Sequence, residues 1–228
     1  MRFFATLIRG IEMLKIDDAI GLIIDGTHEA NRKYLRMSGG ATVHEYGIEP
    51  LISATIAETL YNSGAQRGEE CFVTLETTCW ELVKWSLGGE VEDSVYKDSD
   101  GQRADVVYWN RHNLPEGVVE VKRHFSFSNC EDDIRKISSL LSRLDTQEEG
   151  TLKWGAVASM RETTNTSTKD KKAVLKDFLS KCEEKFPDFT FKGRCEEVEV
   201  EADSAVKKRR PELTAFQAYA VLFRRKKE

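Results

Sequence analysis

Apolar residues are spaced as on one face of a helix near the start of the chain and again after residue 49. Residues 1–40 carry this pattern until Ser38-Gly39-Gly40 interrupts it, which predicts a helical N-terminal extension. A second helix is predicted to begin at Glu49-Pro50, because proline suits the first helical turn, and to end at Asn62-Ser63-Gly64. We expect this second helix to be the first element of the core.

The middle of the chain shows the patterns of β-strands. Residues 71–76 alternate as a strand does, whereas residues 79–87 suit either a continuation of that strand or a short helix. Two valine-rich runs follow, at 101–109 and 117–123, and the polar residues 110–116 between them predict a turn. This region therefore predicts three strands in succession.

Helical and strand patterns alternate after residue 123. Ser128-Asn129 is a candidate N-terminal cap for a helix that runs through Leu144, and residues 154–158 form a short apolar strand. A strand, a helix and a strand in this order predict an α/β layer in which the last strand pairs in parallel.

The last third of the chain predicts further strands and one helix. Residues 161–170 are rich in Thr, Ser and Asn and predict a loop, and the amphipathic helix after them should end at Pro187. Residues 189–191 and 198–200 look like short strands, and residues 216–223 form a strongly apolar last strand.

The 228 residues, of which 40% are hydrophobic, can bury a core, and no repeat or linker divides them. We expect one domain over residues 1–228, with the extension 1–40, a core at 45–160 and a C-terminal β/α elaboration at 161–228. No apolar stretch approaches the roughly 20 residues that span a bilayer. These features predict a cytoplasmic protein with no membrane partner.

Charge is distributed unevenly along the chain. The formal net charge is −5, which is not typical of a nucleic-acid binder. Residues 205–228 nevertheless carry eight Lys or Arg against two Glu, and an acidic stretch at 196–203 precedes them. Two interpretations are open: a solvated hairpin that pairs opposite charges, or a patch that contacts phosphates. The five scattered cysteines lack a C-x-x-C pair and indicate neither a disulfide framework nor a zinc site.

The charged residues of the two valine-rich strands are the strongest candidates for chemistry. Glu120 and Lys122 share one face of their strand because successive side chains alternate, and Asp105 lies on the strand before. Acid-x-Lys also occurs at 170–172 and 183–185, but in polar helical segments. In a valine-rich strand such charges need a partner or a metal ion.

The order of helix, strand, strand with Asp105, strand with Glu120-Val121-Lys122, helix and strand resembles the core of the PD-(D/E)XK nuclease superfamily over residues 45–160. This resemblance implies an α/β, restriction-endonuclease-like core, a mixed central β-sheet flanked by helices (αβββαβ). Ala104 replaces the proline that often precedes the aspartate, and residues 80–100 are an insertion between two core strands.

The resemblance implies a role for each motif residue. Asp105 and Glu120 would ligate Mg²⁺, with Mn²⁺ as a substitute, and the main-chain carbonyl of Val121 would contribute. Lys122 would hold or polarise the attacking water. The superfamily often adds an acid from the first core helix, for which Glu49 is the first choice. The alternatives for that acid are Glu45 and Glu58.

The function that the resemblance implies is that of a Mg²⁺-dependent endonuclease, a phosphodiester hydrolase acting on DNA in restriction, phage defence or repair. A homodimer or a partner protein would supply further phosphate contacts. One alternative is a non-catalytic nucleic-acid-binding or complex-assembly subunit with a nuclease fold. Another is an RNA endonuclease of the same superfamily, with His44 as a metal ligand.

These residues also have ordinary structural explanations. Glu120 and Lys122 could form ion pairs on an exposed sheet face, and Asp105 could pair with Arg103. Four basic residues after the motif could face a phosphate, although the last two equally suit a solvated helix face. They are Arg123, His124, Arg135 and Lys136.

Overall fold

The computed structural model describes residues 14–46, 48–68, 70–87, 101–167 and 170–227. Its strands are β1 (Phe72–Thr78), β2 (Arg103–Trp109), β3 (Pro115–Lys122), β4 (Trp154–Thr164), β5 (Phe189–Glu199) and β6 (Leu213–Arg225). Its helices are α1 (Ile16–Ser38), α2 (Val43–Tyr46), α3 (Glu49–Gln66), α4 (Cys79–Ser86), α5 (Phe127–Leu144), α6 (Lys171–Lys185) and α7 (Ala205–Arg209).

The strands form one mixed six-stranded sheet in the order β1-β2-β3-β4-β6-β5. Among the six described strands only β3 and β4 pair in parallel, with Val119 opposite Ala156, and α5 makes the crossover that a parallel pair requires. The predicted α/β class, the mixed sheet and the parallel pairing are therefore confirmed. The predicted order of core elements is also found, with α4 inserted between β1 and β2.

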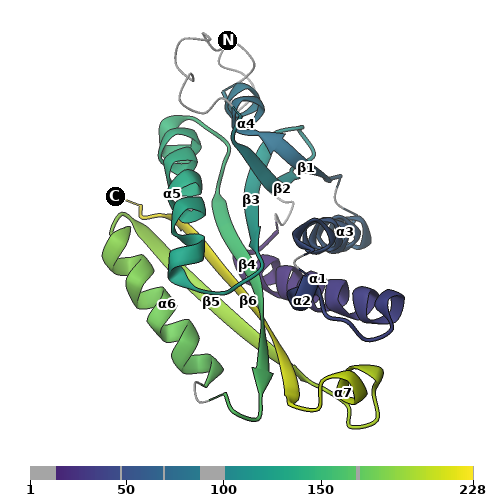
Figure 1. Ribbon diagram of the computed structural model, residues 1–228. Helices are drawn as coiled ribbons and strands as arrows, with labels where there is room; N and C mark the ends of the chain where they lie inside the picture. Colours follow the sequence, from purple (N-terminus) through teal and green to yellow (C-terminus); the bar gives the residue numbers. More distant parts are fainter. Residues whose placement is uncertain (1–13, 47, 69, 88–100, 168–169, 228) are drawn as a thin grey trace.

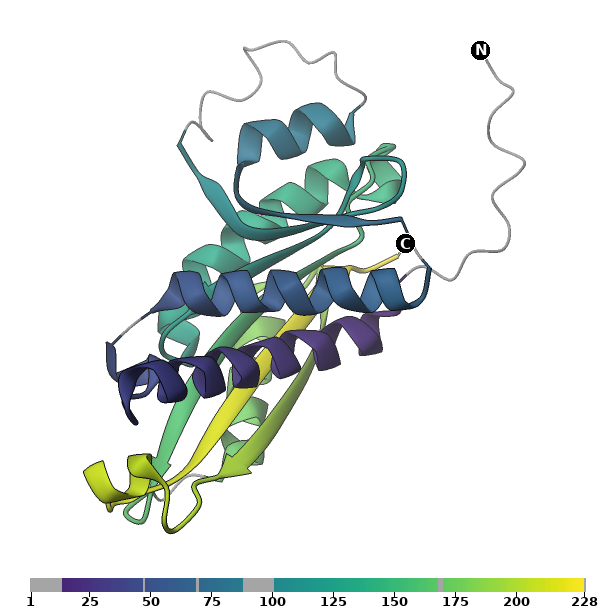
Figure 2. The ribbon, with the colours of Figure 1, turned by 90° about the vertical axis from the view of Figure 1, so that its right-hand side faces the viewer.

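Helices cover both faces of this sheet. One apolar cluster joins α1 and α3 to residues such as Val119 and Val121, and the other joins α4, α5 and α6 to residues such as Val118 and Tyr219. Figures 1 and 2 show α1 and α3 side by side on the first face. A Cβ on Gly26 of α1 would lie 2.7 Å from the Cα of Ile56, so only glycine allows this close approach.

Several element boundaries agree with the sequence prediction. α3 begins at Glu49 as expected and ends at Gln66, shortly after the predicted stop. α1 ends where Gly39 adopts a left-handed conformation with a φ of 67°. The first part of the predicted N-terminal helix, residues 1–13, and residues 88–100 of the predicted insertion lie outside the described residues.

Other predictions were wrong in the C-terminal third and at two turns. Residues 189–199 form one strand rather than two short ones, because β5 pairs with β6 along its whole length. Residues 161–164 belong to β4 instead of a loop, since they also pair with β6. Pro115 begins β3 rather than standing in the turn, and the helix α7 was not predicted.

The ambiguous residues 79–87 include a helix, α4. Thr78 caps it by accepting from the Glu81 amide, while the Glu81 carboxylate accepts from the Thr78 amide, a capping box. All five cysteines are free thiols. No helix in the described part of the chain is long and apolar enough to cross a membrane.

Candidate active site

The site lies where β2 and β3 separate. Their regular pairing ends at Val106 opposite Val119. Beyond it, the Val121 amide donates a hydrogen bond of 2.7 Å to Oδ2 of Asp105 instead of to a main-chain carbonyl. The Asp105 carboxylate thus occupies the opening between the strands. Burial raises the pKa of Asp105, and the Val121 hydrogen bond opposes this rise.

The pairing is also interrupted on the other side of Asp105. The β1–β2 register passes from Leu75 opposite Val106 to Thr77 opposite Ala104, and Glu76 between them has a φ of 54°. A positive φ is uncommon for a residue other than glycine and often accompanies a functional site. The negative charge of Glu76 also acts to raise the pKa of Asp105. Sequence reasoning missed Glu76, since no motif signals a left-handed residue within a strand.

Glu120 projects from β3 toward α5 and is buried, with 3% of its side chain exposed. Its Oε1 lies 2.7 Å from the Lys136 ammonium. The pKa of Glu120 is raised to about 8, mainly because the side chain is buried; Lys136 opposes this rise and the charge of Asp105 adds to it. Even with Lys136 beside it, Glu120 is therefore partly protonated at neutral pH, and a further cation would favour its ionised form.

Lys122 lies on the same face of β3 as Glu120 and contacts another acid, Asp133, which comes from α5. Its Nζ is 3.0 Å from Oδ2 of Asp133. Burial acts to lower the pKa of Lys122, but the hydrogen bond and charge of Asp133 raise it above its usual value, and Glu120 and Glu49 contribute in the same direction. Lys122 is therefore an ammonium ion across the physiological pH range.

Asp133 and Lys136 complete the group because they stand three residues apart on α5, on its sheet-facing side. Lys136 also donates 2.6 Å to the Arg103 carbonyl of β2. The sequence had suggested Lys136 as a phosphate contact or as a residue of a solvated helix face, and had not singled out Asp133. Both lie beside the apolar stripe at Ile134 and Ile137, which was the available signal. Arg135 points outward and pairs with Glu131, as a residue on a solvated face does.

Glu49 approaches the same end of β3 from the opposite side of the sheet. Its Oε1 accepts a 2.7 Å hydrogen bond from the Arg123 amide, directly after β3. The side chains of the alternative acids contact other cations: Glu58 pairs with Lys33 and Glu45 with Arg209. Glu49 is thus the candidate helix acid whose carboxylate the fold brings to this strand end.

His44 lies next to Arg123, whose Nε donates 2.7 Å to its main-chain carbonyl. Nε2 of His44 is 3.0 Å from Nδ1 of His124, and Nδ1 of His44 is 3.7 Å from Oε2 of Glu162. Burial lowers the pKa of His44, against the charge of Glu162. The ring of His44 therefore contacts His124 and Glu162, and its role as a metal ligand stays a prediction.

The donor atoms suit Mg²⁺, which prefers oxygen ligands and keeps several waters. Asp105 and Glu120 supply carboxylates, and Oε1 of Glu120 is buried without a hydrogen-bond partner of good geometry. Within the described residues no three His, Cys, Asp or Glu side chains form a metal-holding group. That result does not bear on Mg²⁺, because one or two carboxylates commonly suffice for this ion.

No protein-family model, curated protein or solved structure matches this chain. Membership of the PD-(D/E)XK superfamily therefore stays a prediction. The Val121 carbonyl likewise stays a predicted ligand.

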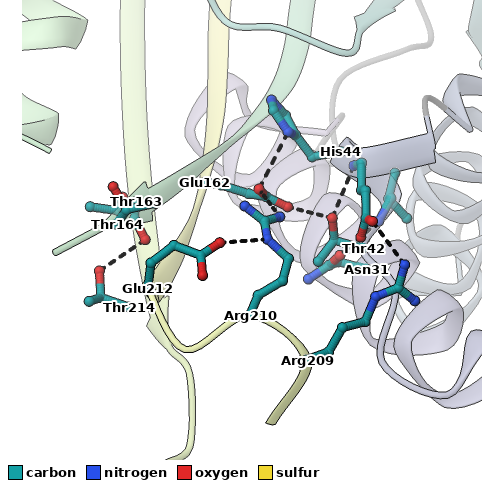
Figure 3. A network of polar contacts seen from close by, with 12 residues as sticks. Asn31, Thr42, His44, Glu162, Thr163, Thr164, Arg209, Arg210, Glu212 and Thr214 are labelled. Atoms are coloured by element: carbon teal, nitrogen blue, oxygen red, sulfur yellow. Dashed lines mark hydrogen bonds and ion pairs between the residues drawn. The ribbon is translucent and has the colours of Figure 1, made fainter. Parts of the chain in front are cut away.

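Two arginines of the basic C-terminal segment, Arg209 and Arg210, contact acidic side chains elsewhere in the molecule, as Figure 3 shows. Arg210 lies 2.5 Å from the buried Glu162 carboxylate and 3.0 Å from Glu212, while Arg209 pairs with Glu45 of α2. The predicted hairpin exists as β5 and β6. Arg209 and Arg210 lie between these two strands and pair with acids outside the stretch 196–203, and the phosphate-contacting patch stays a prediction.

Proposed function

We propose that this protein is a Mg²⁺-dependent endonuclease with a restriction-endonuclease-like core that hydrolyses phosphodiester bonds of DNA. The observation that carries the proposal is the position of Asp105 at the opening between β2 and β3. Glu120 and Lys122 lie on the adjoining strand, and their charges interact with that of Asp105. Two buried carboxylates beside an ammonium are the groups that metal-assisted phosphodiester hydrolysis requires.

The residues would divide the work as follows. Asp105 and Glu120 would hold the ion, which supplies charge neutralisation at the phosphate and activates water when it is bound. Lys122, whose pKa is raised, is suited to stabilise negative charge rather than to accept a proton. Glu49, fixed by the Arg123 amide, would orient the end of β3 and add a negative charge on the far side of Lys122.

The test is cleavage of duplex DNA and of single-stranded RNA by purified protein with Mg²⁺ or Mn²⁺. Asp105→Ala, Glu120→Ala and Lys122→Ala should each reduce DNA cleavage about a hundredfold or more. A matched control is Lys153→Met, which removes a lysine paired with the buried Glu116 of β3, away from the site. Cleavage of RNA alone would show that the substrate is RNA instead of DNA. Absence of any cleavage would refute the nuclease proposal.

A second candidate, a non-catalytic nuclease-fold subunit, is favoured by one observation. The charges of Glu120 and Lys122 already have partners within the protein, Lys136 and Asp133. A titration with Mn²⁺ distinguishes the two candidates. Tight nucleic-acid binding without affinity for the ion would support the second candidate and exclude the first.

A further inference from the structure

Two carboxylates and two ammonium groups alternate between β3 and α5. Lys136 lies 2.7 Å from Glu120 and 4.0 Å from Asp133, while Lys122 lies 3.0 Å from Asp133. Asp133 therefore stands between the two lysines. Each of these four side chains is at least two-thirds buried, so the pairs are weakly screened by solvent.

Asp105 makes the group unequal, since three carboxyl groups face two ammonium ions. We propose that the Lys136 ammonium occupies the cation position beside Glu120 when no divalent ion is bound, and moves to Asp133 when one binds. The inference rests on the proposed function, because it assumes that Asp105 and Glu120 take the ion. It assigns to Lys136 and Asp133 a role in positioning charge that the sequence motif does not include.

The distances support this exchange. A divalent ion at Glu120 repels an ammonium only 2.7 Å from the same carboxylate. Lys136 already has a second carboxylate 4.0 Å away, so a change of side-chain rotamer that gives up its hydrogen bond to the Arg103 carbonyl still keeps it paired with an acid. Its arrival at Asp133 weakens the hold of Asp133 on Lys122, which is then available to the substrate phosphate. Ion binding and the release of Lys122 are thereby coupled.

The test measures Mn²⁺ affinity by calorimetry for the wild type, Lys136→Met, Asp133→Asn and the double variant. Lys136→Met should bind the ion about tenfold more tightly, because a competing cation is removed. Lys153→Met, the matched control, should change the affinity less than twofold. Lys136→Gln, which keeps a neutral hydrogen-bond donor, serves if Lys136→Met does not fold.

The double variant separates an exchange from a general effect of charge. If Lys136 moves to Asp133, Asp133→Asn should weaken Mn²⁺ binding about threefold more when Lys136 is present than when it is absent. Equal factors in the two backgrounds, or no gain in Lys136→Met, would overturn the exchange and leave the proposed function standing. Absence of Mn²⁺ binding in every variant would instead refute the proposed function, and the exchange with it.

Discussion

At the scale of single residues, the site is defined by charges that the fold removes from water. Glu120 and Lys122 occupy two strand positions that hydrophobic residues would fill at no electrostatic cost. Their burial is tolerated because α5 supplies one opposite charge to each. The Asp105 carboxylate is held differently, by a main-chain amide at a gap in the sheet.

The raised pKa of Glu120 predicts a pH dependence of stability in metal-free buffer. Between its usual value of 4.5 and about 8, the folded protein holds a proton on Glu120 that the unfolded chain releases. This group therefore lowers the free energy of unfolding as the pH rises through that window. Glu120→Gln cannot ionise and should remove this loss.

Urea unfolding at pH 5 and pH 8, with a chelator present, measures the effect. From pH 5 to pH 8 the free energy of unfolding of Glu120→Gln should rise by a few kcal/mol relative to that of the wild type, since one pKa unit corresponds to about 1.4 kcal/mol. Glu116→Gln, which changes the other buried glutamate of β3, is the matched control. A constant difference between Glu120→Gln and the wild type would contradict the prediction.

At the scale of elements, helix α5 determines whether the site is neutralised. Its start fixes the rotation that points Asp133 and Lys136 at β3. The sequence suggested Ser128-Asn129 as the cap. In the structure Ser126 is the cap, because its side-chain oxygen accepts a hydrogen bond from the Asn129 amide. Ser126 and Ser128 each place a hydroxyl near the start of the helix, so the local sequence did not show which of them is the cap.

The two serines make a direct comparison possible. Ser126→Ala should lower the free energy of unfolding by about 1 kcal/mol, because it leaves a helix amide without its acceptor. Ser128→Ala lies within the first turn of α5 and should change it by less than about 0.5 kcal/mol. Chemical denaturation measures both, and equal losses would show that the cap is wrongly assigned.

At the scale of the whole molecule, polar contacts connect the C-terminal segment to the N-terminal helices. The side chain of Glu162 on β4 is 7% exposed and contacts Arg210, Thr42 and His44, from both ends of the chain (Figure 3). The site lies beside this network, because Arg123 contacts the carbonyls of His44 and Glu45.

Breaking the network should therefore destabilise the fold. Arg210→Met should lower the free energy of unfolding by about 2 kcal/mol, because Glu162 is left buried without its arginine. Lys208→Met, at an exposed neighbouring position, should have an effect within about 0.5 kcal/mol. Thermal unfolding compares the two. Recovery of stability in Arg210→Met with Glu162→Gln would identify the unpaired carboxylate as the cause.

Much of the architecture could be predicted because it follows from local periodicity. Glu49-Pro50 marked the start of α3, and the valine-rich runs marked β2 and β3. The length of β5 could not be predicted, since its polar middle forms a strand only through pairing with β6. Helix α4 is a different case, because the Thr78-x-x-Glu81 spacing of its capping box is present in the sequence.

The sequence by itself determined that Glu120 and Lys122 share a face of a valine-rich strand, because side-chain alternation depends only on neighbouring residues. Only the tertiary structure decided which groups meet them there. Asp133 and Lys136 reach them from α5, and Glu49 reaches the strand end from α3. The partner of a buried charge is set by how distant elements pack, and that packing depends on the whole chain.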